Sequence, residues 1–222
     1  MIVVERLSDC WYKNVCTEEC SNACIRYLEM KYLMENSNIP KAKQIPQSLT
    51  APKCDMPSYK RLAAIKDDIE VFVNCGCNLY IASTITGNGK TSWAIKLMLK
   101  YFDNVWPGNG FRPRALFIHV PTFLLKCKDF NSKDQDFEDM KSLISNIDLV
   151  VWDDIASTDV SAYDYSQLLM YIDNRLLNEK SNIFTGNYSD RMALEKRVGM
   201  KLASRIWSDT TEVVVFKGGD MR

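Results

Sequence analysis

The chain has no excess of charge of either sign and no long apolar run. Its 222 residues include 28 Lys and Arg and 28 Asp and Glu, so the formal net charge is zero. The molecule as a whole therefore lacks the basic character of a non-specific nucleic-acid binder, and any such binding must come from a local patch. No apolar run approaches the roughly 18 residues that a membrane-spanning helix needs, so we expect no membrane partner.

A secretory leader and disulfide bonds are also not expected. Residues 1–6 lack the charged and then apolar layout of a signal peptide, which predicts a cytoplasmic protein. In that compartment the eight cysteines would be thiols or metal ligands. With 46% hydrophobic and 25% charged residues the composition is that of a globular protein, and the length allows one full domain and a small appendage.

A glycine-containing turn between an apolar run and a helical pattern is the strongest motif in the chain. The run at 78–82 is followed by Thr-Ile-Thr-Gly-Asn-Gly-Lys-Thr at 84–91, and a helix is predicted at 92–101. This order is typical of a P-loop, whose backbone N–H groups surround phosphate oxygens. The usual motif begins with glycine, where this chain has Thr84. The predicted nucleotide-binding residues of the turn are Thr86, Gly87, Asn88, Gly89, Lys90, Thr91 and Ser92.

The chemistry of ATP requires these residue types. Gly87 and Gly89 let the backbone approach phosphate without a Cβ in the way. Lys90 would pair with the β- and γ-phosphates, and the Thr91 hydroxyl would ligate Mg²⁺. The following helix adds the partial positive charge of its N-terminus. We therefore expect ATP and Mg²⁺ as cofactors.

A second motif supplies carboxylates. Residues 148–154 read Asp-Leu-Val-Val-Trp-Asp-Asp, which predicts a buried parallel strand whose carboxyl end faces a ligand crevice. Asp153 would hold Mg²⁺ through its water shell, and Asp154 would orient or deprotonate the attacking water. Most such ATPases have Glu at the second position. Because Asp is shorter by one methylene, we expect slow hydrolysis.

The pattern as a whole predicts an α/β protein in which helices cover a five-stranded parallel sheet. Asn187 follows the fourth strand, where its amide could hold the attacking water or touch the γ-phosphate, although a helix cap is the more ordinary role. The chain stops after the fifth strand, so we expect no helical lid and a neighbouring subunit to complete the site. The predicted strands are 78–82, 115–120, 148–153, 181–185 and 211–216, and the predicted helices are 26–35, 58–74, 122–128, 137–147, 163–178 and 194–207.

Four cysteines crowd the start of the chain, and they suggest three domain-level units. We predict a cysteine-rich docking module at 1–37, a proline-containing linker at 38–56 and an ATPase domain at 57–222. Soft ligands at this density favour a Zn²⁺ site, and an iron–sulfur cluster would use the same ligands. The alternative is a cysteine-rich helix, on which three of the four would share one face. The candidate ligands are Cys10, Cys16, Cys20 and Cys24.

Two further features could bind ligands, but we interpret them as structural. His119, the single histidine, lies within a predicted strand. The loop before that strand contains Trp106, Phe111 and Arg112, with Arg114 just beyond. Aromatic and arginine side chains could stack on single-stranded nucleic acid, yet a surface loop with packing aromatics is the favoured interpretation.

Five short segments, in order along the chain, resemble the DnaC/DnaI-type helicase loaders, a group of AAA+ ATPases. They are Thr-Gly-Asn-Gly-Lys-Thr, Val-Val-Trp-Asp-Asp, Ile-Phe-Thr-Gly-Asn, Leu-Ala-Ser-Arg-Ile and the terminal Gly-Gly-Asp-Met-Arg. The resemblance covers residues 58–222 and is greatest for phage-encoded versions with a cysteine-bearing N-terminus. It makes Asn187 the sensor 1 residue and Arg205 an arginine finger acting on a neighbouring subunit, where the alternative is a surface arginine at a helix end.

The resemblance also implies a function. A loader of this kind uses ATP to deliver a hexameric replicative helicase onto single-stranded DNA during DNA replication, and it assembles as a homo-oligomer through its ATP sites. The N-terminal module would dock the helicase. Three alternatives remain at this stage: an IstB-type transposition helper, a non-hydrolysing ATP-sensing adaptor and a P-loop small-molecule kinase.

Overall fold

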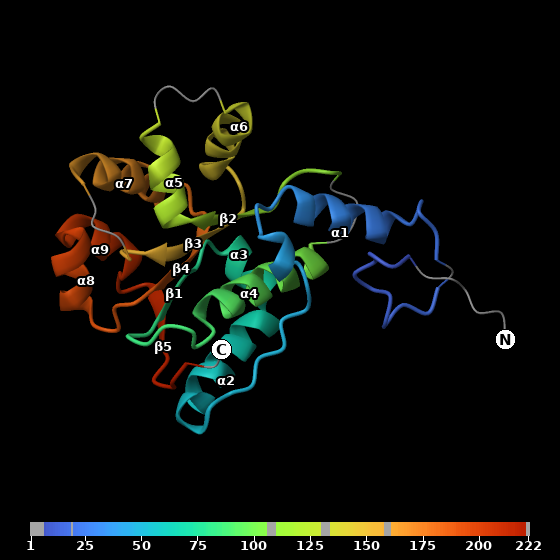
Figure 1. The fold of residues 1–222 in the computed structure, drawn as a ribbon, viewed down its shortest axis with the longest axis horizontal. Helices are drawn as coiled ribbons and strands as arrows, with labels where there is room; N and C mark the ends of the chain where they lie inside the picture. The colour runs from blue at the N-terminus through green and yellow to red at the C-terminus, as the bar shows by residue number, and fades with distance from the viewer. Residues whose placement is uncertain (1–6, 19, 106–109, 130–133, 158–160, 221–222) are drawn as a thin grey trace.

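Five parallel strands form one sheet in the computed structural model, which describes residues 7–18, 20–105, 110–129, 134–157 and 161–220. The strands lie side by side in the order β2-β3-β4-β1-β5 (Figure 1). The predicted α/β class and the five-stranded parallel sheet are thereby confirmed. The strands are β1 (Asn78–Ala82), β2 (Ala115–His119), β3 (Leu149–Ile155), β4 (Ser181–Gly186) and β5 (Thr211–Val215).

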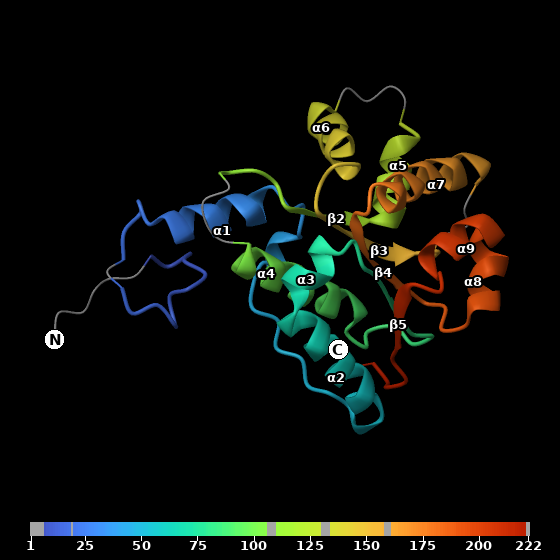
Figure 2. The same ribbon diagram turned by 180° about the vertical axis from the view of Figure 1, so that it is seen from behind.

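Helices cover both faces of the sheet, as the two opposite views show (Figures 1 and 2). Side chains alternate between the faces along each strand, so Leu79 and Ile81 join one buried cluster while Tyr80 and Ala82 join the other. One face carries α1 (Ile25–Glu35), α2 (Met56–Asp67), α3 (Ile69–Asn74) and α4 (Lys90–Asn104). The other carries α5 (Val120–Cys127), α6 (Gln135–Ile144), α7 (Ala162–Leu177), α8 (Arg191–Val198) and α9 (Met200–Ile206).

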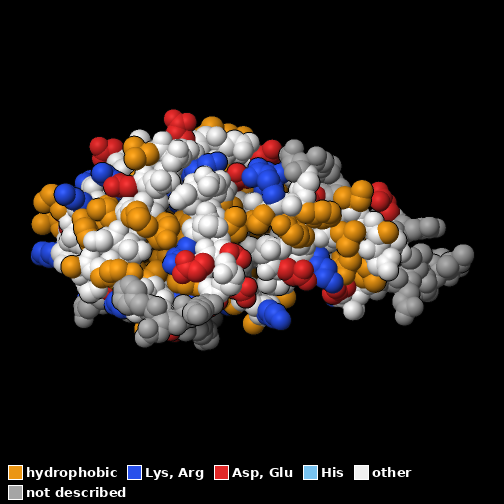
Figure 3. All heavy atoms as spheres, turned by 90° about the horizontal axis from the view of Figure 1, so that it is seen from above, with side chains coloured by type: hydrophobic (Ala, Val, Ile, Leu, Met, Phe, Trp, Pro, Cys, Tyr) orange, Lys and Arg blue, Asp and Glu red, His pale blue; other side chains and the backbone are white. Residues whose placement is uncertain are grey.

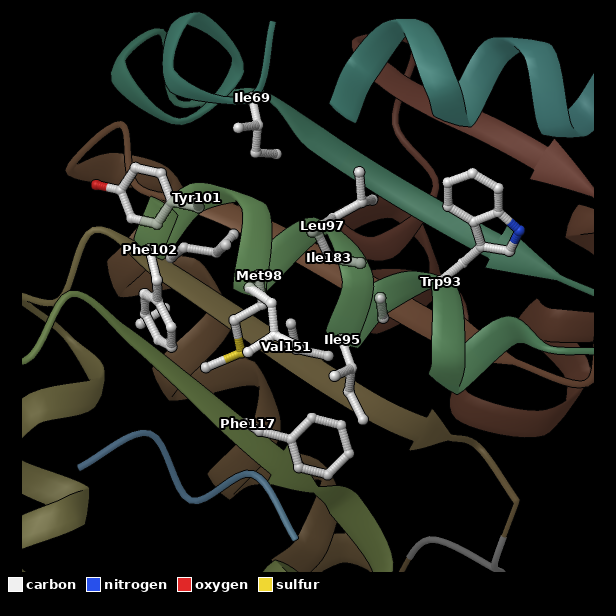
Figure 4. Close-up of a cluster of buried hydrophobic side chains, with 14 of the residues drawn as sticks. Ile69, Trp93, Ile95, Leu97, Met98, Tyr101, Phe102, Phe117, Val151 and Ile183 are labelled. Carbon is white, nitrogen blue, oxygen red and sulfur yellow. The ribbon is translucent and has the colours of Figure 1, made fainter. Parts of the chain in front are cut away.

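Helix α4 positions the glycine turn on the sheet. It begins directly after Gly89 and buries a row of large side chains, among them Ile95 and Met98. Figure 4 shows these side chains packed toward Phe117 and Val151 of the neighbouring strands. Burial of an aliphatic side chain of this size contributes about 1.5–3 kcal/mol. The start of the helix, and with it the turn, is therefore held firmly against the sheet.

Two predicted helices are each divided in the structure. The helix predicted at 58–74 is interrupted at Asp68, which separates α2 from α3. The helix predicted at 194–207 is interrupted at Gly199, whose φ of 80° lies in a region that favours glycine. The first of these helices also begins two residues earlier than predicted, at Met56, and the Ser58 hydroxyl donates to the Val215 carbonyl oxygen at 2.7 Å.

The cysteine-rich start is not helical where it is described. The chain runs through turns until Cys24, which is the residue that precedes α1. The expectation that cysteines at four-residue spacing share one helical face is therefore wrong. Cys10 and Cys16 pack instead against the buried cluster that contains α1 and α4.

The predicted linker lies along the body of the molecule. Near its start, the Ser37 carbonyl oxygen accepts a hydrogen bond from the Phe117 amide of β2 at 2.8 Å. At its far end, the Asp55 carboxylate accepts from the amides of Lys217 and Gly218, at 2.7 and 3.0 Å, just after β5. Two short 3₁₀ turns lie in between, η1 (Lys41–Lys43) and η2 (Lys53–Asp55). The segment thus joins the two edges of the sheet, and the division into three units stays a prediction.

Side chains of both charges lie side by side on one face of the molecule. Figure 3 shows Lys and Arg side chains interspersed with Asp and Glu over one face, as the zero net charge leads one to expect. Within the part of the chain that the structure describes, no helix combines the length and apolar character needed to cross a bilayer.

A candidate nucleotide-binding site at the carboxyl edge of the sheet

A cavity of about 390 Å³ lies where β2, β3 and β4 end and the glycine turn begins. Parallel strands place their carboxyl ends together, so residues far apart in the sequence meet here. Every described residue around the cavity is polar, charged or glycine, as a polyphosphate and its metal ion would require. The cavity is lined by Lys43, Thr86, Gly87, Asn88, Gly89, Lys90, Thr91, Ser92, His119, Asp153, Asp154, Thr185 and Asn187.

The glycine turn is already folded around its own polar groups. Gly87 and Gly89 have φ values of 75° and 92°, which a residue with a Cβ adopts only with strain. The Lys90 side chain is buried, and its ammonium donates to the Ile85 carbonyl oxygen at 3.1 Å and to Asn88 Oδ1 at 3.4 Å. This arrangement holds the ammonium at the turn, where a phosphate oxygen would be its stronger partner.

A serine that no motif predicted supports the same turn. Ser83 is fully buried at the end of β1, and its hydroxyl accepts from the Ile85 amide at 3.1 Å. The Asn88 side-chain amide also donates to this hydroxyl. A small polar residue directly after an apolar strand is a weak signal, because it is common wherever a strand ends.

The two predicted magnesium-binding groups touch one another. Thr91 Oγ1 donates to Asp153 Oδ1 at 2.7 Å, and Thr185 Oγ1 donates to the same oxygen at 2.8 Å. A hydroxyl and a carboxylate are the hard oxygen ligands that Mg²⁺ prefers. The residues present therefore fit Mg²⁺, with Thr91 as a ligand and Asp153 acting directly or through a bound water.

Burial changes the titration of this carboxylate. Asp153 is almost fully inaccessible, and desolvation raises the pKa of its carboxyl above the ordinary value. The hydrogen bonds from Thr91 and Thr185 and the nearby His119 act in the opposite direction. A bound divalent cation would favour the charged form strongly, so the site is better suited to a metal-bound carboxylate than to a free one.

Asp154 has an unusual backbone conformation. Its φ is 59°, in the left-handed region, and the pairing of β3 with β4 is irregular between Trp152 and Ile155. A bulge of this kind redirects a side chain at the end of a strand. The Asn187 side-chain amide donates to Asp154 Oδ1 at 3.3 Å, so these two predicted site residues are brought together.

Thr185 is a site residue that no motif predicted, and His119, which we interpreted as structural, also borders the cavity. The Thr185 hydroxyl accepts from the Asp154 amide at 2.9 Å while it donates to Asp153, so it fixes both acids. His119 ends β2 directly opposite Asp153 in the strand register and borders the cavity. Its exposed ring bonds Thr122 through Nδ1 at 2.8 Å. The strand ends of a parallel sheet provided the available signal, since Thr185 closes a predicted strand and His119 is the residue before the last of another.

Arg205 lies apart from this cavity. It occupies the last turn of α9, where its guanidinium forms an ion pair with Asp173 of α7 at the surface. The structure therefore does not bring Arg205 to the nucleotide site of its own chain. A role for this residue requires a second chain.

The cysteines do not form a metal site in the described residues. Cys10, Cys16, Cys20 and Cys24 are free thiols and partly buried. Across the described ranges, no three His, Cys, Asp or Glu side chains are grouped closely enough to bind a metal ion. The arrangement therefore does not fit the predicted zinc or iron–sulfur site. Cys20 Sγ instead accepts a hydrogen bond from the Leu7 amide at 3.3 Å.

The loop before β2 uses its arginines within the protein. Arg112 and Arg114 both donate to Asp148 Oδ2 at 3.3 Å, at the start of β3 and so at the edge of the sheet away from the cavity. The Phe111 ring lies 5.5 Å from that of Tyr32 in α1. These contacts favour the structural interpretation of the loop, and Trp106 lies outside the described residues.

Comparison with known proteins finds similar folds, but no family model or curated protein that matches the sequence. The structure is similar to a crystal structure of the DnaC helicase loader, with a TM-score of 0.59 and 23% identity over 77% of this chain and 94% of that one. A crystal structure of DnaI gives a TM-score of 0.63 and 15% identity over 84% and 95% of the two chains.

AMPPCP-bound DnaA from Aquifex aeolicus is a third similar structure, with a TM-score of 0.56 and 14% identity over 75% of this chain and 48% of that one. The identities are low, so these likenesses establish the α/β fold alone.

Proposed function

We propose that this chain is an AAA+ ATPase that loads a replicative DNA helicase onto single-stranded DNA. The observation that carries the proposal is the 2.7 Å hydrogen bond between Thr91 and Asp153. This bond joins the glycine turn to β3, the strand that carries Asp153 and Asp154, at one polar cavity. The fold of the chain is that of a DnaC helicase loader and of DnaI. The loader would act in the cytoplasm, in a bacterial host if the chain is phage-encoded.

The residues around the cavity have distinct roles in this proposal. The turn at 86–92 and the Lys90 ammonium bind the phosphates. Thr91 and Asp153 hold Mg²⁺, which neutralises developing charge on the phosphoryl group when it is bound. Asp154 accepts a proton from the attacking water or orients it, and Asn187, which already bonds Asp154, keeps that carboxylate in place.

Arg205 would complete the site of a neighbouring subunit. An arginine supplied in trans stabilises transition-state charge in P-loop enzymes. The ion pair with Asp173 leaves Arg205 at the surface with its side chain 45% exposed, where a second chain could reach it. Homo-oligomerisation through the ATP sites is therefore part of the proposal.

The N-terminal segment and α1 would dock the helicase. They extend from one end of the molecule, away from α8 and α9 at the other end (Figures 1 and 2). Contacts to single-stranded DNA would come from a local patch on the assembled ATPase, because the formal net charge of each chain is zero.

Capture of a bacterial replicative helicase tests this proposal. Full-length protein is immobilised and incubated with purified hexameric helicase, with and without Mg·ATP, beside a Lys90→Ala variant. The proposal predicts retention of the helicase by the wild-type protein and a changed retention when ATP is added. The Lys90→Ala variant should lose the response to ATP. No retention under any nucleotide condition would remove the helicase as the partner.

A non-hydrolysing ATP-sensing adaptor is the second candidate function. The backbone conformation of β3 at Asp154 supports it. The left-handed backbone at Asp154 and its short side chain place the carboxylate differently from a glutamate on a regular strand. A single-turnover assay separates the two functions. Phosphate release that Lys90→Ala abolishes supports an ATPase, and ATP binding without phosphate release supports the adaptor.

A further inference from the structure

One lysine from outside the ATPase motifs lines the nucleotide cavity. Lys43 is the last residue of η1, in the segment predicted to be a linker, and its side chain is exposed at the cavity. No motif in the sequence points to it. The other residues at the cavity come from the glycine turn and from the ends of β2, β3 and β4.

The backbone around Lys43 is held in place by local hydrogen bonds. The Lys43 amide donates to the Pro40 carbonyl oxygen at 2.7 Å, which closes the 3₁₀ turn. Gln44 Nε2 donates to the carbonyl oxygens of Ile39, at 2.9 Å, and Met34, at 3.3 Å. The Ile39 side chain is buried in the main core. The position of Lys43 therefore follows from packing.

The same segment is anchored to strand β2. The Phe117 amide donates to the Ser37 carbonyl oxygen at 2.8 Å, and Asn38 Nδ2 donates to the Phe117 carbonyl oxygen at 3.1 Å. His119, two residues further along β2, also borders the cavity. The edge strand thus fixes the path that brings Lys43 to the end of the sheet.

The chemistry of the cavity indicates what Lys43 would contact. Among the described residues that line it, none has an apolar side chain that would pack on a nucleobase. The cavity therefore corresponds to the phosphate and metal end of a nucleotide site. Lysine presents a compact, strongly hydrated charge on a flexible stem, which suits a phosphate oxygen at the margin of a site.

We propose that Lys43 contacts the polyphosphate of ATP from within the same chain. This inference rests on the proposed nucleotide site. Lys90 supplies the buried charge at the turn, and Lys43 supplies a second charge from the exposed side of the cavity. The segment at 37–47 is then part of the nucleotide site as well as the connection from α1 to the ATPase core.

A pair of charge-removing variants tests the inference. Mg·ATP affinity is measured by titration calorimetry on the full chain carrying Lys43→Ala, with Lys41→Ala as the matched control. Lys41 is an exposed lysine of the same 3₁₀ turn and is not among the residues around the cavity. We expect about fivefold weaker binding for Lys43→Ala, as the loss of one partly solvated ion pair implies. Lys41→Ala should bind like the wild type.

Two further measurements make the result specific. Lys43→Arg should keep most of the affinity, because it keeps the charge, and Lys43→Ala should show a weaker dependence of ATP binding on salt. Thermal unfolding without nucleotide should be the same for all three variants, since both lysines are exposed.

Equal affinities for Lys43→Ala and Lys41→Ala would overturn the inference. The proposed nucleotide site itself would still stand if Lys90→Ala abolishes binding in the same assay. Absence of ATP binding by the wild-type protein would instead overturn the proposed function.

Discussion

At the scale of single residues, the site brings together groups that a bound ligand would stabilise further. Asp153 and Asp154 are adjacent carboxylates, and Asp153 is buried with a raised carboxyl pKa. A buried charge without a partner of opposite sign costs stability. The hydrogen bonds from Thr91 and Thr185 reduce that cost, and a bound magnesium ion would offset it further.

Replacement of Asp153 by Asn should make the nucleotide-free protein more stable. The folded state raises this carboxyl pKa above its ordinary value of 3.8, so the destabilisation is fully present above the raised pKa, shrinks as the pH falls through it and is gone once the pH is below the ordinary value. Asn keeps an oxygen for the hydrogen bonds from Thr91 and Thr185 and removes the charge. We expect a gain on the order of 1 kcal/mol, or about 2–4 °C in the melting temperature.

Differential scanning calorimetry across pH 5–8 measures this effect, with exposed Asp129→Asn as the control. The stabilisation that Mg·ATP gives the wild-type protein should also be lost in Asp153→Asn. A lower melting temperature for Asp153→Asn at neutral pH would contradict the prediction. It would show that the hydrogen bonds to the Asp153 carboxylate already offset the cost of burying its charge.

Cysteine reactivity provides a second prediction at this scale. Burial raises the pKa of the Cys127 thiol to about 11, whereas Cys54 is exposed. At pH 8 only about one Cys127 thiol in a thousand would be the reactive thiolate. Alkylation with iodoacetamide, followed by peptide mass spectrometry, should therefore modify Cys54 long before Cys127. In guanidinium chloride the two should react alike, and equal rates in the folded protein would contradict the described burial.

At the scale of helices and strands, hydrophobic pattern predicted the sheet and most helices. Apolar runs ending in polar residues located all five strands, because strands covered on both faces are apolar throughout. The interruptions at Asp68 and Gly199 were not predicted. The apolar spacing continues across both breaks, so the pattern alone describes one helix in each case.

The turn at Gly199 should depend on the absence of a side chain. Its φ of 80° and ψ of 151° lie in a region that is essentially restricted to glycine. Gly199→Ala should lower the free energy of unfolding by about 1–3 kcal/mol through backbone strain. The nearest atom to an added Cβ is in the Tyr165 ring at 3.5 Å, which is ordinary contact, so steric overlap is not the cause.

Urea denaturation measures the effect of Gly199→Ala. Gly219→Ala is the matched control, because its φ is ordinary and no atom lies within 4 Å of an added Cβ. The control should unfold like the wild type. If both variants unfold at the same urea concentration, the break between α8 and α9 does not depend on glycine.

The sequence predicted the motif residues at the cavity better than the other residues that line it. Lys90, Thr91, Asp153, Asp154 and Asn187 meet at one cavity because each follows or ends a strand at the same edge. Thr185 and Lys43 were missed and His119 was interpreted as structural, since their positions at the cavity depend on register and on the path of a segment along β2. The cysteine spacing was misleading, because regular spacing indicates a shared face only when the chain is helical.

At the scale of the whole molecule, the proposed ATP hydrolysis depends on contacts between chains. The cavity contains the groups that we propose bind ATP, while Arg205 lies on α9 paired with Asp173. If the Arg205 of a neighbouring subunit acts at each site, ATP binding and the action of the arginine can be removed in two separate variants. Mixing these variants should then restore sites that have both.

Lys90→Ala and Arg205→Ala should each reduce ATP hydrolysis by about 100-fold or more, the first through phosphate binding and the second through transition-state charge. Mixed in equal amounts, they should recover up to about a quarter of wild-type activity, because random assembly pairs intact turns with intact arginines at that frequency. Steady-state phosphate release measures this. No recovery on mixing, in samples shown to exchange subunits, would contradict a role for Arg205 in trans.

The most direct test of helicase loading is deposition of helicase on DNA. Single-stranded DNA coated with its binding protein is attached to beads and incubated with replicative helicase and ATP, with wild-type protein, with Lys90→Ala or with neither. The account predicts that the wild-type protein increases the helicase retained after a salt wash several-fold and that Lys90→Ala does not. Equal retention in all three samples would contradict the proposal that this chain uses ATP to load a helicase.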